Sequence, residues 1–117
     1  MSQLSQQEVY QAIGRIIVNF PLLECDKCAK AVMQWLAKNS IEGKIIQLRT
    51  KRRNEVFITS DRWNPNESIT ENGTHYGVEV LGLVFDNLSA EGMTREDWLR
   101  DFHCPSEQFI VEELESL

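Results

Sequence analysis

Residues of the types that carry out nucleophilic attack on carbonyl carbon occur in the chain order Cys25, His75 and Asp86. In such a triad a thiolate attacks the carbonyl, an imidazole moves the proton, and a carboxylate fixes the tautomer of the imidazole. Cys25 stands where a helix is predicted to begin, and the free N–H groups and dipole at a helix start favour a negatively charged sulfur. The same N–H groups could hold the oxyanion that forms during the attack. The sequence therefore indicates Cys25 as a nucleophile.

Cys28 is an alternative nucleophile because it lies in the first turn of the same predicted helix. The apolar face of this helix consists of Ala29, Val32, Met33 and Leu36. At about 100° per residue, the centre of that face lies about 30° from Cys25 and about 90° from Cys28. If the face packs on a sheet, Cys25 points to the sheet edge and Cys28 points along a flank. This geometry favours Cys25.

His75 and Asp86 occupy the outer ends of two predicted strands, HYGVEV and LVFD. A tight turn at Leu81-Gly82 would join the strands as an antiparallel pair and bring their outer ends side by side. Asp86 or Asn87 could then reach the imidazole of His75. The sequence thus predicts His75 as the base and Asp86 as the residue that orients it.

Hydrophobic periodicity and turn residues predict the remaining elements. Helices are predicted at 6–19, between an N-cap at Ser5 and Pro21, at 25–39, and at 94–102, with Thr94 as the cap. Strands are predicted at 44–50, 55–60, 75–80 and 83–86, the first two as a hairpin, whereas 109–117 is either a strand or a frayed helix. Helices that precede strands favour a single α+β domain over residues 1–117, with an antiparallel sheet against a central helix.

Residues 61–74 form a predicted polar loop that leads into His75. Long loops in compact domains are often functional, and loops on a rigid scaffold commonly supply specificity. Trp63 offers a large stacking surface within this loop. We therefore expect Trp63 to contact substrate at the entrance of the site.

The composition excludes several classes of partner. A net charge of −6 argues against a sequence-independent grip on nucleic acid, because such a grip needs clustered Lys and Arg. No apolar run has the roughly 20 residues that a membrane span needs, and the first residues do not resemble a signal peptide. The 3 cysteines are an odd number, so at least one thiol is free. We expect a soluble protein that is cytoplasmic as synthesised and binds neither nucleic acid nor membrane.

Two other interpretations of the same residues remain. Cys25 and Cys28 with His103 and Cys104 could suggest zinc, but the ligand spacing does not fit. The pair Cys25 and Cys28 could suggest a redox motif, but the strand context of such a motif is missing, so no metal or cofactor is expected. An acidic surface carrying Trp63 and the pair Trp98 and Phe102 could instead contact a partner, although aromatic residues at helical spacing are more often core. The domain would then be a non-enzymatic interaction module.

The stretch CDKCAKAVMQWLAKNSIEGKIIQL resembles the nucleophile helix and following strand of transglutaminase-like and papain-like domains. HYGVEV followed by LVFDN resembles their His strand and Asp strand. Together with REDWLRDFHCP, the pattern is most similar to the papain fold toxins of bacterial polymorphic toxin systems, in particular the second of these families. The resemblance extends from Leu22 to Pro105.

The resemblance implies a papain-like fold, with N-terminal helices and the nucleophile helix on a small antiparallel sheet. It implies a Cys25–His75–Asp86 site that acts on protein amide bonds, as a peptidase, a glutamine deamidase or a transglutaminase-like enzyme. Papain-like enzymes also use a polar oxyanion donor upstream of the cysteine, and Asn19 could serve. The implied partners are a protein substrate and a cognate immunity protein, and a toxin of this kind could be secreted or delivered as an effector.

Overall fold

The computed structural model describes residues 4–117, so the first three residues of the predicted 1–117 domain lie outside the described part. Its helices are α1 (Gln6–Ile17), α2 (Cys25–Lys38) and α3 (Arg95–Arg100). Its strands are β1 (Lys44–Thr50), β2 (Thr59–Ser60), β3 (Thr74–Val80), β4 (Leu83–Asp86), β5 (Ser89–Met93), β6 (Phe102–His103) and β7 (Phe109–Leu114). All three predicted helices are confirmed, each slightly shorter than predicted.

The three helices differ in how the free backbone N–H groups of their first turns are hydrogen-bonded. Ser5 caps α1 in a reciprocal capping box, in which its hydroxyl accepts from the Glu8 amide and its own amide donates to the Glu8 carboxylate. Thr94 caps α3 through its hydroxyl. No side-chain hydrogen bond caps α2 at Glu24. The helix that begins at Cys25 therefore starts without a side-chain acceptor on its first N–H groups.

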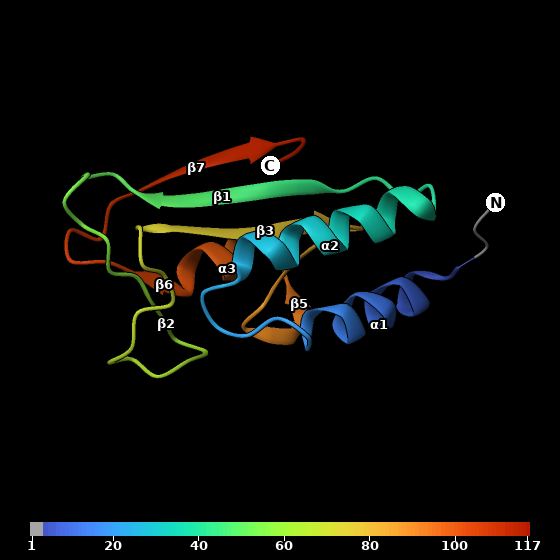
Figure 1. Ribbon diagram of the computed structural model, residues 1–117, viewed down its shortest axis with the longest axis horizontal. Helices are drawn as coiled ribbons and strands as arrows, with labels where there is room; N and C mark the ends of the chain where they lie inside the picture. The colour runs from blue at the N-terminus through green and yellow to red at the C-terminus, as the bar shows by residue number, and fades with distance from the viewer. Residues whose placement is uncertain (1–3) are drawn as a thin grey trace.

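Five antiparallel strands form the main sheet in the order β5–β4–β3–β1–β7 (Figure 1). Strands β3 and β4 are joined by the predicted tight turn, in which Leu81 and Gly82 both have positive φ. Positive φ at both turn residues matches the twist of the strands they join. The pairing of Val80 with Leu83 and of Val78 with Phe85 continues toward His75 and Asp86 at the far end. The predicted pair of strands is confirmed.

The predicted hairpin of 44–50 with 55–60 is wrong. Strand β1 pairs with β3 on one side and with β7 on the other, so both of its edges are occupied. Only Thr59–Ser60 of the second stretch is a strand, and it pairs with β6. Val56 and Phe57 lie outside this strand and are exposed, which fits the rule that β-branched and aromatic residues favour a strand only where they can pack against neighbours. The C-terminal stretch, left open between strand and helix, is the strand β7.

The central strands β1, β3 and β4 are buried on both faces of the main sheet, because their alternating side chains contribute to a core cluster on each side. Helices α1 and α2 cover one face, where Figure 1 shows them lying side by side. That cluster contains Val9, Ile13, Ile17, Cys28, Ala29, Val32, Leu36, Ile45, Val78, Val80 and Phe85. The second cluster contains Ile46, Leu48, Ile58, Ile69, Val84, Leu88, Trp98 and Phe102. The α+β class, with the Cys25 helix packed against an antiparallel sheet, is confirmed.

Cys28, expected along a flank of α2, is buried. Cys28 is 2% exposed and belongs to the cluster under α1 and α2. Helix α1 packs against α2 as well as the sheet does, and residues of α1 belong to the same cluster as Cys28, so a position off the main apolar face of α2 is also buried.

Candidate active site

His75 and Asp86 form a buried hydrogen-bonded pair at the outer ends of β3 and β4. The Nε2 atom of His75 lies 3.0 Å from Oδ2 of Asp86, and both side chains are fully buried. The ring of His75 also stacks on Trp98 and packs against Phe102. The predicted contact between these two residues is therefore present, and their surroundings exclude water from it.

The carboxylate of Asp86 receives several N–H donors. Trp98 Nε1 donates to Oδ2 at 2.8 Å, and the Leu88 amide donates to Oδ1 at 3.1 Å. The guanidinium of Arg62 donates to Oδ1 at 2.9 Å and to Oδ2 at 2.8 Å. Burial opposes ionisation of this carboxyl, but the hydrogen bonds and charges of His75 and Arg62 outweigh it and hold the pKa of Asp86 well below its usual range.

His75 is held in its protonated form by the same contacts. Burial by itself would lower its pKa, but the hydrogen bond to Asp86 and the interaction with Cys25 raise the pKa of His75 to about 9. The ring is therefore an imidazolium at neutral pH. Its Nδ1 atom is buried and has no hydrogen-bond partner of good geometry.

Cys25 is the first residue of α2 and borders a small cavity. Its side chain lies close enough to His75 to raise the pKa of the ring, although the sulfur does not form a well-aligned hydrogen bond with Nδ1. Such contacts are often loose before substrate binds. The cavity has a volume of about 270 Å³ and is lined by Leu23, Cys25, Asp26, Ile69, Thr70, Glu71, Asn72, Thr74 and Tyr76. Cys25 is thus the thiol that has both an imidazolium and an open space beside it.

Cys28 has neither property. Burial, followed by electrostatic interactions with Asp86 and Cys25, raises the pKa of the Cys28 thiol to about 12. A thiol with such a pKa stays protonated at neutral pH and is a poor nucleophile. Cys28 does not line the cavity that contains Cys25. The structure therefore supports Cys25 over the alternative.

Two other predicted site residues lie elsewhere. The side-chain amide of Asn19 donates to the Arg15 carbonyl at 3.2 Å, and Asn19 does not line the cavity, so nothing supports it as an oxyanion donor. Trp63 is 39% exposed, and its indole donates to Glu67 at 2.6 Å. It also lies outside the cavity lining. The predicted loop does border the cavity, but through residues 69–72 and not through Trp63.

Sequence reasoning missed Arg62 and the role of Trp98. The polar sequence around Arg62 predicts a solvated loop residue, yet its side chain is only 17% exposed. Trp98 was expected in the core, which is correct, but its indole N–H also binds Asp86. One signal could have pointed to such a residue, because Asp86 ends an apolar strand and a carboxylate that becomes buried there needs a countercharge.

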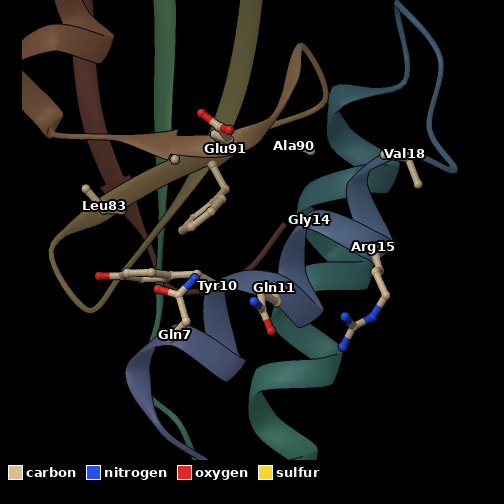
Figure 2. Close-up of a pocket in the computed structure, with 11 residues that line it drawn as sticks. Gln7, Tyr10, Gln11, Gly14, Arg15, Val18, Leu83, Ala90 and Glu91 are labelled. Carbon is tan, nitrogen blue, oxygen red and sulfur yellow. The ribbon is translucent and has the colours of Figure 1, made fainter.

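A more spacious hollow than the Cys25 cavity lies away from this site. It measures about 780 Å³ between α1 and the β4–β5 hairpin, where Gln7, Tyr10 and Gln11 of the helix lie below Leu83 and Glu91 of the hairpin (Figure 2). No cysteine or histidine lines it. Its size therefore does not make it the centre of the chemistry.

Neither a metal site nor a membrane span is found within residues 4–117. No three His, Cys, Asp or Glu side chains gather there in a way that could hold a metal ion. His103, the histidine of the zinc hypothesis, contacts Asp61 and Glu107. None of the described helices is long and apolar enough to cross a bilayer.

The pKa shifts of the buried pair predict that stability is greatest between about pH 4 and about pH 6.5. The pKa of Asp86 is lower in the folded chain than in the unfolded chain, so its contribution is complete above about pH 4 and is lost below that. The pKa of His75 is about 9 when folded and about 6.5 when unfolded, so its contribution is complete below about pH 6.5. It is lost as the pH rises to 9. Thermal unfolding between about pH 3 and about pH 10 tests this expectation.

His103 provides the control for this measurement. Its contacts with Asp61 and Glu107 also raise its pKa, but its side chain is exposed. We expect His103→Gln to keep most of the alkaline decline in melting temperature, and His75→Gln to remove it. A wild-type melting temperature that stays constant between about pH 6.5 and about pH 9 would count against a protonated, buried His75.

Comparison with known proteins identifies the family of the chain. The family model described as papain fold toxin 2 matches residues 8–103, which include Cys25, His75 and Asp86. No curated protein and no solved structure matches the chain. The matched span runs from α1 through β6 and covers most of the chain. The chain therefore belongs to the papain fold toxin 2 family.

Proposed function

We propose that this papain-like toxin domain is a cysteine enzyme that cleaves or exchanges protein amide bonds through a thioester on Cys25. The observation that carries the proposal is the buried His75–Asp86 pair beside the thiol that begins α2. A protonated imidazole next to a thiol stabilises the thiolate, which is the attacking form. The structure supports this arrangement over a passive core cysteine, because Cys25 opens onto a cavity.

In the proposed reaction the Cys25 sulfur attacks the carbonyl carbon of a bound amide. The negative charge moves to the carbonyl oxygen, where the N–H groups of the first turn of α2 can stabilise it, since no side chain caps them. His75 gives its Nδ1 proton to the departing nitrogen as the C–N bond breaks, leaving a thioester. Asp86 stabilises the imidazolium and keeps its Nδ1 toward the sulfur.

Water then resolves the thioester. His75, now neutral, takes a proton from the water as the water oxygen attacks the carbonyl carbon, and the C–S bond breaks to release a carboxylic acid and the thiolate. If the departing nitrogen belongs to a peptide bond, the enzyme is a peptidase. If it is the side-chain amide of glutamine, ammonia leaves and the enzyme is a deamidase. An amine in place of water would give transglutamination.

Intact-mass spectrometry of purified proteins incubated with the chain distinguishes these outcomes. Cleaved chains indicate a peptidase, a gain of about one mass unit indicates a deamidase, and addition of a supplied amine indicates amide exchange. The Cys25→Ala variant, incubated in parallel, should leave every mass unchanged. If no mass changes with the wild-type chain and Cys25 alkylates no faster than free cysteine, the domain is an interaction module and not an enzyme.

Membership of a toxin family makes a protein target the natural expectation. We propose that the chain is delivered as an effector and that a cognate immunity protein protects the cell that makes it. Expression of the wild-type chain in a bacterial host should arrest growth, whereas Cys25→Ala should not. Equal toxicity of both would separate the toxic effect from the proposed chemistry.

A further inference from the structure

Arg62 joins two buried carboxylates that come from different parts of the fold. Its Nε donates to Asp101 at 2.9 Å, while its two terminal nitrogens donate to Asp86 at 2.9 and 2.8 Å. The side chains of Asp86 and Asp101 are 0% and 4% exposed. From this geometry we propose that Arg62 is a positioning residue, which holds the Asp86 carboxylate in the one orientation that serves His75. This inference rests on the proposed function.

The forked contact fixes both oxygens of Asp86. Oδ1 binds Arg62 and the Leu88 amide, and Oδ2 binds Arg62 together with His75 and Trp98. A guanidinium that engages a carboxylate with two parallel N–H bonds sets the plane of that carboxylate as well as its distance. With both oxygens engaged, the carboxylate cannot rotate away from Nε2 of His75. Lysine carries the charge but lacks the planar fork, so it would not reproduce this orientation.

The small second sheet supports Arg62 itself. Strands β2 and β6 pair Ser60 with Phe102, and the Ser60 hydroxyl donates to the Asp101 carboxylate and accepts from the Arg62 amide. The backbone amide of Asp61 donates to the Asp101 carbonyl at 2.9 Å. The guanidinium also lies over the Phe102 ring, 5.7 Å from its centre. The pairing of β2 with β6 thus holds the start of the loop against the end of α3, where Arg62 can reach Asp86.

Arg62 also connects the triad to the loop that borders the cavity. The segment that follows it in sequence reaches the Cys25 cavity at residues 69–72 and then enters β3 at Thr74, next to His75. The loop is therefore tied at one end by Arg62 and at the other by the strand that carries His75. Removal of Arg62 should loosen the orientation of Asp86 without removing any group that touches the reacting atoms.

The test is the rate at which iodoacetamide alkylates Cys25 in the folded protein between about pH 4 and about pH 8, with the modified cysteine identified by mass spectrometry. We expect Arg62→Gln to reduce this rate roughly tenfold near pH 6 and to move the profile to higher pH, because Asp86 no longer steadies the imidazolium. Arg62→Lys should restore part of the rate, since it keeps the charge. Arg100→Gln is the matched control, because Arg100 is exposed and bonds only to Glu96 among the described contacts.

A double-mutant cycle tests whether Arg62 acts through Asp86. In an Asp86→Asn background, adding Arg62→Gln should change the alkylation rate by less than about twofold, because the carboxylate that Arg62 orients is already gone. If Arg62→Gln does not fold, Asp101→Asn provides a second route, since it weakens the support of Arg62 while leaving Arg62 and Asp86 in place. It should lower the rate in the same direction.

Two results would overturn the inference. One is a folded Arg62→Gln or Asp101→Asn protein with the wild-type alkylation profile, even if its melting temperature is lower, since the contact would then serve stability alone. The other is a full effect of Arg62→Gln in the Asp86→Asn background. A wild-type Cys25 that is no more reactive than free cysteine would overturn the proposed function as well. A reactive wild type with an unchanged Arg62→Gln profile overturns only the role of Arg62.

Discussion

Replacing Cys25 with alanine is expected to abolish turnover of any amide substrate. Without the thiol no thioester can form, and loss of one member of a catalytic triad can reduce turnover by roughly 10⁶-fold. The substitution should have little effect on folding, because Ala is tolerated at the start of a helix and few atoms are removed. Activity and melting temperature measured on the same preparation test both parts of the expectation.

Cys28→Ala is the matched control for this experiment. Cys28 lies three residues further along α2 and is buried in the cluster under α1 and α2. Its loss should reduce the free energy of unfolding by about 1–2 kcal/mol through imperfect packing, while the folded fraction keeps its activity. Activity that survives Cys25→Ala and disappears in Cys28→Ala would show that the other thiol is the nucleophile.

Asp86→Ala should affect stability and activity together. The change leaves the buried His75, the half-buried Arg62 and the indole of Trp98 without their shared acceptor. Removal of one partner from a buried ion pair typically costs about 3–5 kcal/mol, which is a large share of the roughly 5–15 kcal/mol that stabilises a domain. In the folded fraction, loss of the residue that orients the base should reduce turnover by about 10⁴-fold.

Two variants serve as controls for this prediction. Asp86→Asn keeps the shape of the side chain but not its charge, so it should fold better than Asp86→Ala while the alkylation of Cys25 remains impaired. Glu96→Ala removes an exposed carboxylate that pairs with Arg100, and it should change the free energy of unfolding by less than about 1 kcal/mol. Urea unfolding of all three variants gives the comparison. An Asp86→Ala protein as stable and as active as Glu96→Ala would refute the buried site.

The structure also changes where specificity should be sought. The sequence pointed to Trp63, but the residues of the loop that border the Cys25 cavity include Thr70, Glu71 and Asn72. The hydroxyl of Thr70 is engaged with the Thr74 carbonyl and the Asn72 side chain, so the loop is ordered by its own hydrogen bonds there. Loop substitutions intended to alter substrate choice should therefore begin at these positions.

Local features of this protein follow from its sequence alone. The N-caps at Ser5 and Thr94, the start of α2 at Cys25 and the tight turn at Leu81-Gly82 each depend on residues within a few positions of one another. Because that turn sets the register of β3 and β4, it also brings His75 to Asp86, which lies only 11 positions away. The central pair of the candidate site could thus be predicted, since a hairpin converts short sequence spacing into contact.

Only the tertiary structure decided the features that depend on distant segments. Strand β7 pairs with β1, although the 55–60 stretch was expected to be the partner of β1. The residues of a strand do not by themselves specify which other strand it pairs with. Arg62 contacts Asp86 across 24 positions and Asp101 across 39, because the pairing of β2 with β6 carries it there. Burial then makes these contacts strong, since a charge removed from water must be paired, and no local pattern around Arg62 reveals that it will be buried.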